Sequence, residues 1–302
     1  MASLPERVNI VEVGPRDGLQ NEATPVPTAT KLAFIGMLVE AGLKQIEATA
    51  FVHPKAVPQL ADALEVARGL PNAPGVTFSA LVPNEKGLER AREARLRRIA
   101  VFTAASETFT QKNIRMTIDE SLRGFEAAVR VALADGMSVR GYVSTCFVCP
   151  YEGEVPKEKV REVSERLLGI GVDQVAISDT IGAAAPTDVH RTVGYVLERV
   201  PRDRIALHFH DTYGTALANV FAGLQLGIDT FDSSAGGLGG CPFAPGAAGN
   251  VATEDLVYML DRMGIETGVS LEGVLDAARI VGTALGRDLT SRQWKRKMCH
   301  CS

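Results

Sequence analysis

Residues 174–234 read QVAISDTIGAAAPTDVHRTVGYVLERVPRDRIALHFHDTYGTALANVFAGLQLGIDTFDSS, and short apolar runs alternate there with longer amphipathic ones. The short runs have the length of strands and are Gln174–Ser178, Ile205–Phe209 and Thr230–Ser234. The longer runs have the period of helices and are Pro186–Val200 and Thr215–Leu226. Strands separated by helices of this length predict βαβ units with parallel strands.

The same alternation extends toward the N-terminus. Further candidate strands are Val8–Val13, Gln45–Thr49, Thr77–Leu81, Arg98–Phe102 and Ser138–Ser144, and further helical patterns are Thr28–Ala41, Ile118–Asp135 and Pro156–Ile170. Eight strands with parallel crossovers predict a (β/α)₈ TIM barrel. A doubly wound open sheet is the alternative, because periodicity does not show whether a sheet closes.

No change in composition marks a second domain, so the chain is predicted to form a single catalytic domain over residues 1–302. We expect the barrel over about residues 8–264 and an extra C-terminal helical segment over about residues 265–290. The last stretch, residues 291–302, is expected to be a flexible, frayed tail.

The charge and the cysteine content of the chain argue against several classes of protein. The net charge of −4 gives no reason to expect a nucleic-acid partner, and no apolar run is long enough to predict a membrane span. The five cysteines are odd in number and unevenly spread, which is a poor match to a secreted disulfide framework. Residues 1–7 pass directly into the first predicted strand, so we expect no signal peptide and a cytoplasmic protein.

Polar and charged residues stand at the carboxyl ends of the predicted strands. They are Arg16 and Asp17 after the first strand, Glu47 within the second, Asp179 after the sixth, and His208 with His210 at the seventh. In a (β/α)₈ barrel the carboxyl ends of all strands meet at one mouth, where active sites of this fold are built. We therefore expect these side chains to lie close together.

The two histidines of Leu207-His-Phe-His-Asp211 are candidate metal ligands. Residues two apart on a strand point to the same face, with Cα atoms roughly 6.6 Å apart, so both imidazoles can bind one ion. The pair alone is equally compatible with ordinary polar contacts at a strand end. Asp17 and Asn250, at other strand ends, add oxygen donors. This mixed set favours Mg²⁺ or Mn²⁺ over a closed zinc site.

The stretch Val13-Gly-Pro-Arg-Asp-Gly-Leu-Gln-Asn-Glu22 places an adjacent arginine and aspartate in a turn rich in glycine and proline. Most such ion pairs lie on protein surfaces. Here the pair ends an apolar strand, and the turn residues suit a backbone that approaches a ligand. On that interpretation Asp17 binds the metal, and Arg16 offers hydrogen-bond donors to a developing enolate oxygen.

The glycine-rich stretch SAGGLGGCPFAPGAAGN, residues 234–250, follows the last predicted strand. It could be a flexible linker, but a lone leucine, cysteine and phenylalanine among the glycines favour a mobile loop over the barrel mouth. No Gly-Lys-Ser/Thr follows, so the stretch does not match a P-loop. Cys241 lies between small residues and could reach the site as a proton donor.

With these residues in view, the sequence resembles the 3-hydroxy-3-methylglutaryl-CoA lyases, within the wider group of metal-dependent lyase and synthase barrels. The resemblance runs from about Val8 to Gly286, and its motifs are Val13–Glu22, Glu47–Thr49, Phe51–Lys55, Cys149–Gly153, His208–His210 and Gly237–Phe243. The last motif is the most specific, because related synthases lack this cysteine-bearing loop.

The resemblance implies cleavage of 3-hydroxy-3-methylglutaryl-CoA to acetyl-CoA and acetoacetate with a divalent metal, Mg²⁺ or Mn²⁺, in a homodimer or higher homo-oligomer. The implied metal ligands are Asp17, His208, His210 and Asn250. The implied catalytic residues are Arg16, Asp17, Glu47, Asp179, His208 and Cys241, and the implied substrate contacts are Arg16 and Gln20. The general base stays open between Asp17 and His208.

Some positions depart from the family pattern. Ala50 stands where serine is frequent, Ala176 and Ser178 replace the usual serine and glycine, and Ala23 stands where lysine is common. These changes leave the metal residues intact but could alter the acyl pocket, so a lyase for a related 3-hydroxyacyl-CoA stays open. A condensing synthase or aldolase of the same barrel stays open too, as does a non-catalytic barrel that binds CoA or a metal.

Overall fold

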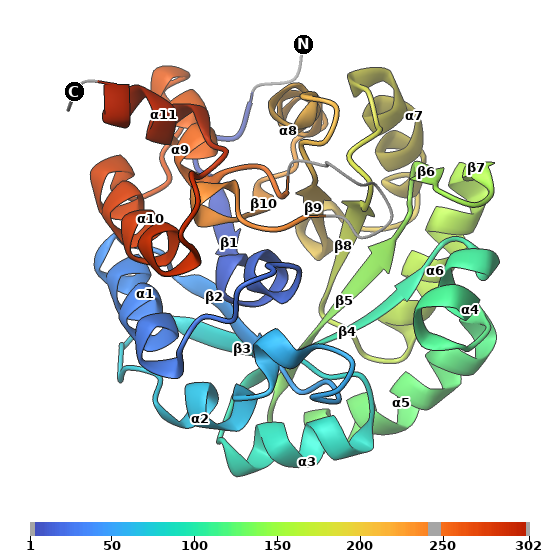
Figure 1. Cartoon of the computed structure of the whole chain (residues 1–302). Coiled ribbons are helices and arrows are strands. Elements are labelled where there is room, and N and C mark those ends of the chain that lie inside the picture. The colour runs from blue at the N-terminus through green and yellow to red at the C-terminus, as the bar shows by residue number, and fades with distance from the viewer. Residues whose placement is uncertain (1–3, 241–248, 300–302) are drawn as a thin grey trace.

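The computed structural model describes residues 4–240 and 249–299 of the chain. Eight parallel strands close into a barrel in the order β1-β10-β9-β8-β5-β4-β3-β2 (Figure 1). The barrel strands are β1 (Asn9–Glu12), β2 (Gln45–Ala50), β3 (Thr77–Leu81), β4 (Arg98–Ala104), β5 (Ser138–Ser144), β8 (Gln174–Asp179), β9 (Ile205–Phe209) and β10 (Thr230–Ser233). The closed order confirms the predicted TIM barrel and shows that the open-sheet alternative is wrong.

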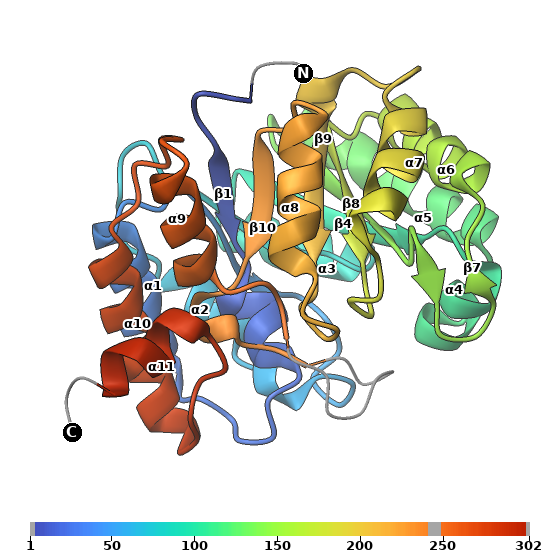
Figure 2. The ribbon, with the colours of Figure 1, turned by 90° about the horizontal axis from the view of Figure 1, so that it is seen from above.

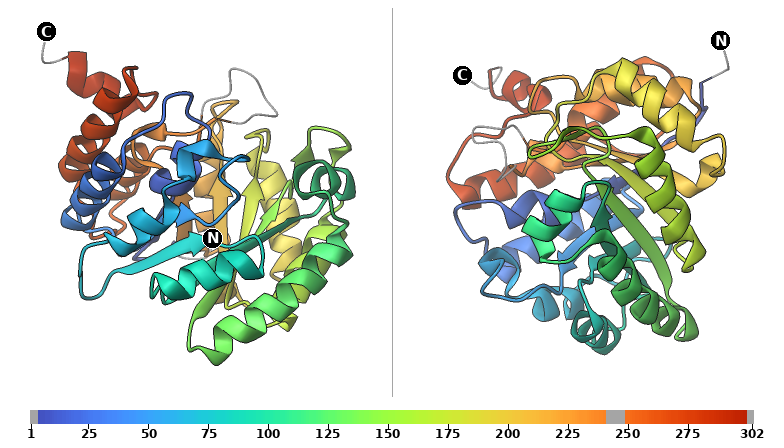
Figure 3. Two further views of the ribbon diagram at one scale, coloured as in Figure 1. Left: turned by 60° about the horizontal axis from the view of Figure 1, so that its bottom comes forward. Right: turned by 90° about the vertical axis from the view of Figure 1, so that its right-hand side faces the viewer.

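Helices form a ring outside the barrel (Figures 2 and 3). They are α1 (Thr28–Glu40), α2 (Ala63–Arg68), α3 (Glu85–Glu93), α4 (Glu107–Ile114), α5 (Ile118–Ala134), α6 (Lys157–Gly169), α7 (Pro186–Val196), α8 (Ala216–Gln225) and α9 (Thr253–Arg262). Short helical turns are η1 (Gly14–Gly18), η2 (Pro58–Leu60), η3 (Arg202–Arg204) and η4 (Ala235–Gly237), and a small hairpin is formed by β6 (Val148–Cys149) and β7 (Gly153–Glu154).

Helix α5 shows how sequence positions these helices. Thr117 and Glu120 form a reciprocal capping box at its start. Ile118, Leu122 and Phe125 recur at intervals of three and four residues and are buried. This spacing puts them on one helical face, which therefore packs against the barrel.

Strand β5 separates two layers of core. Val139 and Val143 belong to the large core cluster of the molecule, whereas Tyr142 belongs to a second, smaller cluster. The other buried members of the second cluster are Ala50, Leu60, Leu81, Ala100, Ala176 and Ala206. Because alternate residues of a strand point to opposite faces, Arg140 shares the inner face with Tyr142. Small inner residues leave room for these long polar side chains inside the barrel.

The C-terminal segment differs from expectation at its end. Helix α10 (Leu271–Leu285) packs against α1, in keeping with an extra helical segment after the barrel. Residues expected to be a frayed tail form a further helix, α11 (Arg292–Cys299), in which Trp294 is buried. The Asp255 carboxylate accepts hydrogen bonds from the first backbone amides of α11, so a buried indole and a capped N-terminus hold this helix. Among the described residues, no helix is both long and apolar enough to span a membrane.

Candidate active site

The turn after β1 places Arg16 and Asp17 at the mouth of the barrel. The chain forms one π-helical turn, η1, in which the Val13 carbonyl accepts hydrogen bonds from the amides of Arg16 (3.1 Å), Asp17 (2.7 Å) and Gly18 (3.2 Å). The Glu12 carboxylate accepts a hydrogen bond from the Gly14 amide at 2.8 Å. This compact turn lets two neighbouring side chains enter the same site.

Three of the predicted metal ligands come together. Asp17, His208 and His210 are buried and each offers a ligand atom within 4.8 Å of the others. His210 Nε2 lies 3.6 Å from Asp17 Oδ2. The histidines lie at the end of β9 and Asp17 lies on η1, so the site joins the seventh barrel strand to the turn after the first. The chain therefore has a possible metal site where the sequence predicts one.

Asn250, the fourth predicted ligand, lies beside this cluster. Its Nδ2 donates hydrogen bonds to Asp17 Oδ2 (2.9 Å) and to the Leu238 carbonyl (3.2 Å). Its Oδ1 is buried and has no hydrogen-bond partner among the residues that the structure describes. A buried acceptor without a partner is costly, whereas an amide oxygen with a carboxylate and two imidazoles is a suitable ligand set for a divalent ion. The residues present thus fit a metal.

Arg16 is buried and held on two sides. Its Nε donates a hydrogen bond to Glu47 Oε1 and its Nη1 to Asp17 Oδ1, both at 2.5 Å. Burial by itself lowers the pKa of the guanidinium, but the negative charges of Glu47 and Asp17 outweigh this and raise the pKa. Arg16 is therefore a fixed positive charge next to the candidate metal ligands.

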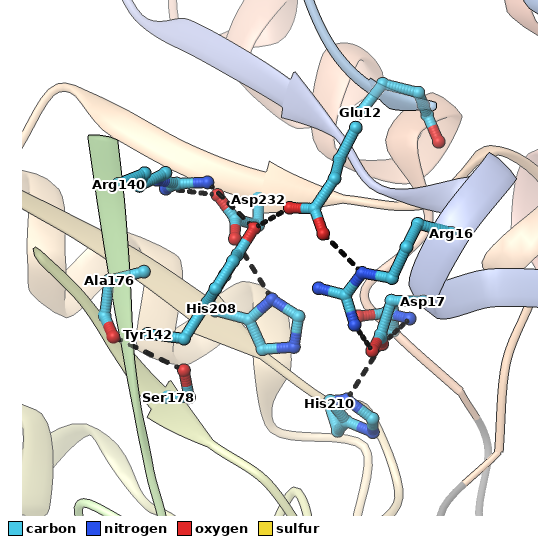
Figure 4. Close-up of polar contacts among 12 residues, drawn as sticks. Glu12, Arg16, Asp17, Arg140, Tyr142, Ala176, Ser178, His208, His210 and Asp232 are labelled. Carbon is cyan, nitrogen blue, oxygen red and sulfur yellow. Dashed lines mark hydrogen bonds and ion pairs between the residues drawn. The ribbon is translucent and has the colours of Figure 1, made fainter. Parts of the chain in front are cut away.

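A chain of polar contacts crosses the barrel interior and was not predicted from the sequence (Figure 4). Tyr142 donates a hydrogen bond to Glu47 at 2.5 Å, and Arg140 donates to the Tyr142 hydroxyl at 3.1 Å. Arg140 also donates to Asp232 at 2.7 Å, and the second oxygen of Asp232 lies 3.1 Å from His208 Nδ1. The available signal was a charged residue in the interior of each of the buried strands β5 and β10.

The other predicted site residues differ in their placement. Asp179 ends β8 as expected, but its carboxylate accepts hydrogen bonds from the amides of Ala183 (3.1 Å) and Ala184 (3.0 Å). Burial raises the pKa of Asp179 to about 6. Gln20 is half-buried just beyond η1. Cys241 lies outside the described residues, so the structure does not test its predicted role.

The start of the glycine-rich stretch is held by side chains. The amide of Ala235 donates to Glu12 Oε1 at 3.0 Å, and that of Gly236 donates to both oxygens of Glu254, at 3.0 and 2.9 Å. The Asn21 side chain donates to the Gly240 carbonyl at 2.9 Å. Residues 235–240 are thus a fixed stem for the stretch that contains the predicted catalytic cysteine.

Comparison with known proteins gives a consistent set of relatives. The sequence model of the HMGL-like family matches residues 7–281. The mitochondrial hydroxymethylglutaryl-CoA lyase of Bos taurus is 50% identical over 292 residues, which cover 97% of this chain and 90% of that protein. The crystal structure of hydroxymethylglutaryl-CoA lyase from Pseudomonas aeruginosa has a TM-score of 0.96 and 46% identity, covering 98% of this chain and 99% of that one.

A further solved structure is an HMG-CoA lyase from Acinetobacter baumannii in complex with coenzyme A and 3-methylmalate. It has a TM-score of 0.92 and 40% identity, and the match covers 98% of this chain and 96% of that one. The fold, the family model and the sequence similarity over nearly the whole chain agree with the motifs at the mouth of the barrel. The chain therefore belongs to the HMGL-like family.

Proposed function

We propose that this chain is a carbon–carbon lyase that cleaves 3-hydroxy-3-methylglutaryl-CoA to acetyl-CoA and acetoacetate. The observation that carries the proposal is the buried cluster of Asp17, His208 and His210 beside the fixed charge of Arg16. Relatives that are 50% identical to this chain are named hydroxymethylglutaryl-CoA lyase. The bound coenzyme A in the Acinetobacter baumannii lyase supports an acyl-CoA as the substrate class.

The metal would be held by the two imidazoles, by Asp17 and by the Oδ1 of Asn250, and the donor set favours Mg²⁺ or Mn²⁺. A bound divalent ion supplies Lewis-acid chemistry that lowers the pKa of a substrate hydroxyl and fixes its orientation. Asp17 is suited to remain ionised in such a site. Burial acts to raise its pKa, but Arg16 and the hydrogen bond from His210 hold the pKa well below its usual value.

Arg16 would stabilise the charge that develops during cleavage. When the C2–C3 bond of the substrate breaks, negative charge collects on the thioester oxygen. A guanidinium that Glu47 and Asp17 already orient loses little freedom when it meets this charge, which is the condition for strong electrostatic stabilisation. Glu47 is in turn fixed by the Tyr142 hydroxyl.

The general base that takes the hydroxyl proton is best assigned to Asp17. A His208 ring that would hold the metal through one nitrogen and pairs with Asp232 through the other has no nitrogen left to accept a proton. Asp17 keeps its negative charge in the same cluster, although the hydrogen bonds from Arg16 and Asn250 weaken it as a base. Cys241 would protonate the acetyl-CoA carbanion after cleavage.

A related acyl-CoA substrate is a second candidate because of two small residues inside the barrel. Ala50 and Ala176 are buried in one apolar cluster with Tyr142, the partner of Glu47. On the resemblance described above, each alanine stands where serine is usual, so we infer that an acyl group near Tyr142 would meet a wider and less polar surface. The homo-oligomeric state, the single catalytic domain and the cytoplasmic location stay predictions from the sequence.

The decisive experiment is product analysis with purified protein, 3-hydroxy-3-methylglutaryl-CoA and Mg²⁺ or Mn²⁺. We expect acetyl-CoA and acetoacetate in equal amounts, no turnover after treatment with a chelator, and recovery when the metal is restored. His210→Gln should abolish this recovery, whereas His190→Gln, at an exposed position on α7, should not change it.

Full turnover of the chelated protein would contradict the metal site. Turnover confined to other 3-substituted glutaryl-CoA esters would favour the second substrate. Condensation of acetyl-CoA with a 2-oxo acid, in place of cleavage, would identify a synthase.

A further inference from the structure

His208 has a carboxylate partner on the neighbouring strand. His208 and Asp232 are paired in the register of the parallel strands β9 and β10, so their side chains leave the sheet side by side. His208 Nδ1 lies 3.1 Å from Asp232 Oδ2. Asp232 is 1% exposed, and its other oxygen accepts a hydrogen bond from Arg140 Nη2 at 2.7 Å. Both oxygens of this buried carboxylate therefore have specific partners.

The contact determines which nitrogen of His208 carries the proton. Asp232 forms a buried ion pair with Arg140 at 2.7 Å, and this guanidinium balances the negative charge of the carboxylate. An ionised carboxylate can only accept a hydrogen bond. Nδ1 must therefore be the donor, and in the neutral ring Nε2 then keeps its lone pair.

The free nitrogen of His208 faces the other candidate ligands. Figure 4 shows its Nδ1 edge turned toward Asp232 and the opposite edge turned toward Asp17 and His210. The two histidines differ in the hydrogen-bond partners of their Nδ1 atoms. His210 Nδ1 is buried and, among the described residues, has no hydrogen-bond partner.

We propose that Asp232 is a positioning residue, which holds His208 as the Nδ1–H tautomer and aims the Nε2 lone pair at the metal position between Asp17 and His210. Arg140 keeps Asp232 available for this role by balancing its charge in the barrel interior. Asp232 itself does not touch the candidate metal position; it acts through His208. The proposal rests on the metal site of the proposed function.

The first measurement uses the metal-free wild-type protein. Histidine-selective ¹⁵N labelling and long-range ¹H–¹⁵N spectra distinguish the two neutral tautomers, and the His208→Gln variant identifies the His208 signals among those of the five histidines. We expect the proton of neutral His208 on Nδ1. A proton on Nε2 would overturn the proposal, and this result does not require lyase activity.

The second measurement uses Asp232→Asn, which keeps the size of the side chain. Its amide can donate to His208 Nδ1, so we expect the proton to move to Nε2 and the affinity for Mn²⁺, titrated by electron paramagnetic resonance, to fall about 10–100-fold. Asp173→Asn is the control, because Asp173 also forms an ion pair with an arginine, Arg98, although at a more exposed position, and has no histidine partner among the described residues. Unchanged Mn²⁺ affinity in Asp232→Asn would contradict the positioning role.

The two outcomes separate this proposal from the proposed function. If the tautomer and the Mn²⁺ affinity change in Asp232→Asn as expected but the wild-type protein does not cleave the acyl-CoA, the positioning role stands and the activity assigned above is wrong. If cleavage proceeds in the wild type while Asp232→Asn retains full Mn²⁺ affinity, the activity stands and Asp232 has no positioning role.

Discussion

Arg16 illustrates how single side chains acquire a defined role in this site. A guanidinium with hydrogen bonds to two buried carboxylates has one orientation. Its remaining N–H groups are left to donate hydrogen bonds to a bound substrate. Tyr142 adds its ring, whose centroid lies 5.3 Å from Arg16 Cζ. The charge is thus fixed before any substrate binds, which makes it effective in a transition state.

We expect Arg16→Gln to lower kcat by about 10²–10³-fold, because a neutral amide cannot balance the charge on the thioester oxygen. The affinity for the acyl-CoA, measured by calorimetry with coenzyme A esters, should remain nearly unchanged. Arg68→Gln, which removes an exposed arginine of a surface ion pair, is the control and should leave kcat unchanged. An effect limited to KM would show that Arg16 only binds the ground state.

Residues that stand at strand ends could be predicted from the sequence, and residues that act across the barrel could not. Asp17 and His208 come directly after or at the end of apolar runs, so the fold itself brings them together. Tyr142 meets Glu47, and Arg140 meets Asp232, at separations of 95 and 92 residues along the chain. Such contacts depend on how the inner faces of distant strands align when the barrel closes. The spacing of residues along the chain does not predict this alignment.

Among the elements, the strands were predicted best, since each is a short apolar run between polar turns. Thr77–Leu81 and Ile205–Phe209 have the predicted bounds. The π-helical turn η1 was missed because its hydrogen bonds converge on one carbonyl, that of Val13, and leave no periodic pattern. Helix α11 was missed because its run of charges suggests an exposed tail, whereas Trp294 and the cap from Asp255 depend on tertiary contacts.

The cap on α11 can be tested by changing Asp255. Asp255→Ala removes the acceptor for the Arg292 and Gln293 amides and should destabilise α11 by about 1 kcal/mol, while Asp255→Asn should retain most of the cap. Amide hydrogen exchange at residues 292–299 measures this locally. Equal exchange in the alanine and asparagine variants would show that the cap contributes little.

At the scale of the whole molecule, buried carboxylates make stability depend on pH. Burial raises the pKa of Glu254 from its ordinary value of 4.5 to about 7. The folded state therefore binds this proton more tightly than the unfolded state does. The resulting stabilisation is fully present below pH 4.5 and is lost as the pH rises through about 7.

We expect Glu254→Gln to remove this dependence, because glutamine stays neutral and can still accept from the Gly236 amide. Relative to wild type, its free energy of unfolding in urea should rise with pH, by about 3 kcal/mol at most between the two pKa values. Glu12, whose pKa burial also raises to about 7, is present in both proteins and contributes to the difference only through the small effect of the Glu254 charge on its pKa. Glu126→Gln, at an exposed position, is the control. A difference that does not vary with pH would contradict the assignment.

The pairing of β1 with β10, which closes the barrel, has a consequence for the synthesis of the protein. Asn9 of β1 is paired with Thr230 of β10, so the two strands come from opposite ends of the barrel sequence. At a ribosomal rate of roughly 5–20 residues per second, a nascent chain carries β1 for roughly 10–50 seconds before β10 exists. During that interval one edge of β1 has no strand to pair with, and such an edge can recruit a strand from another chain. We therefore expect the pace of translation, and not only equilibrium stability, to influence the yield of closed barrels in the cell.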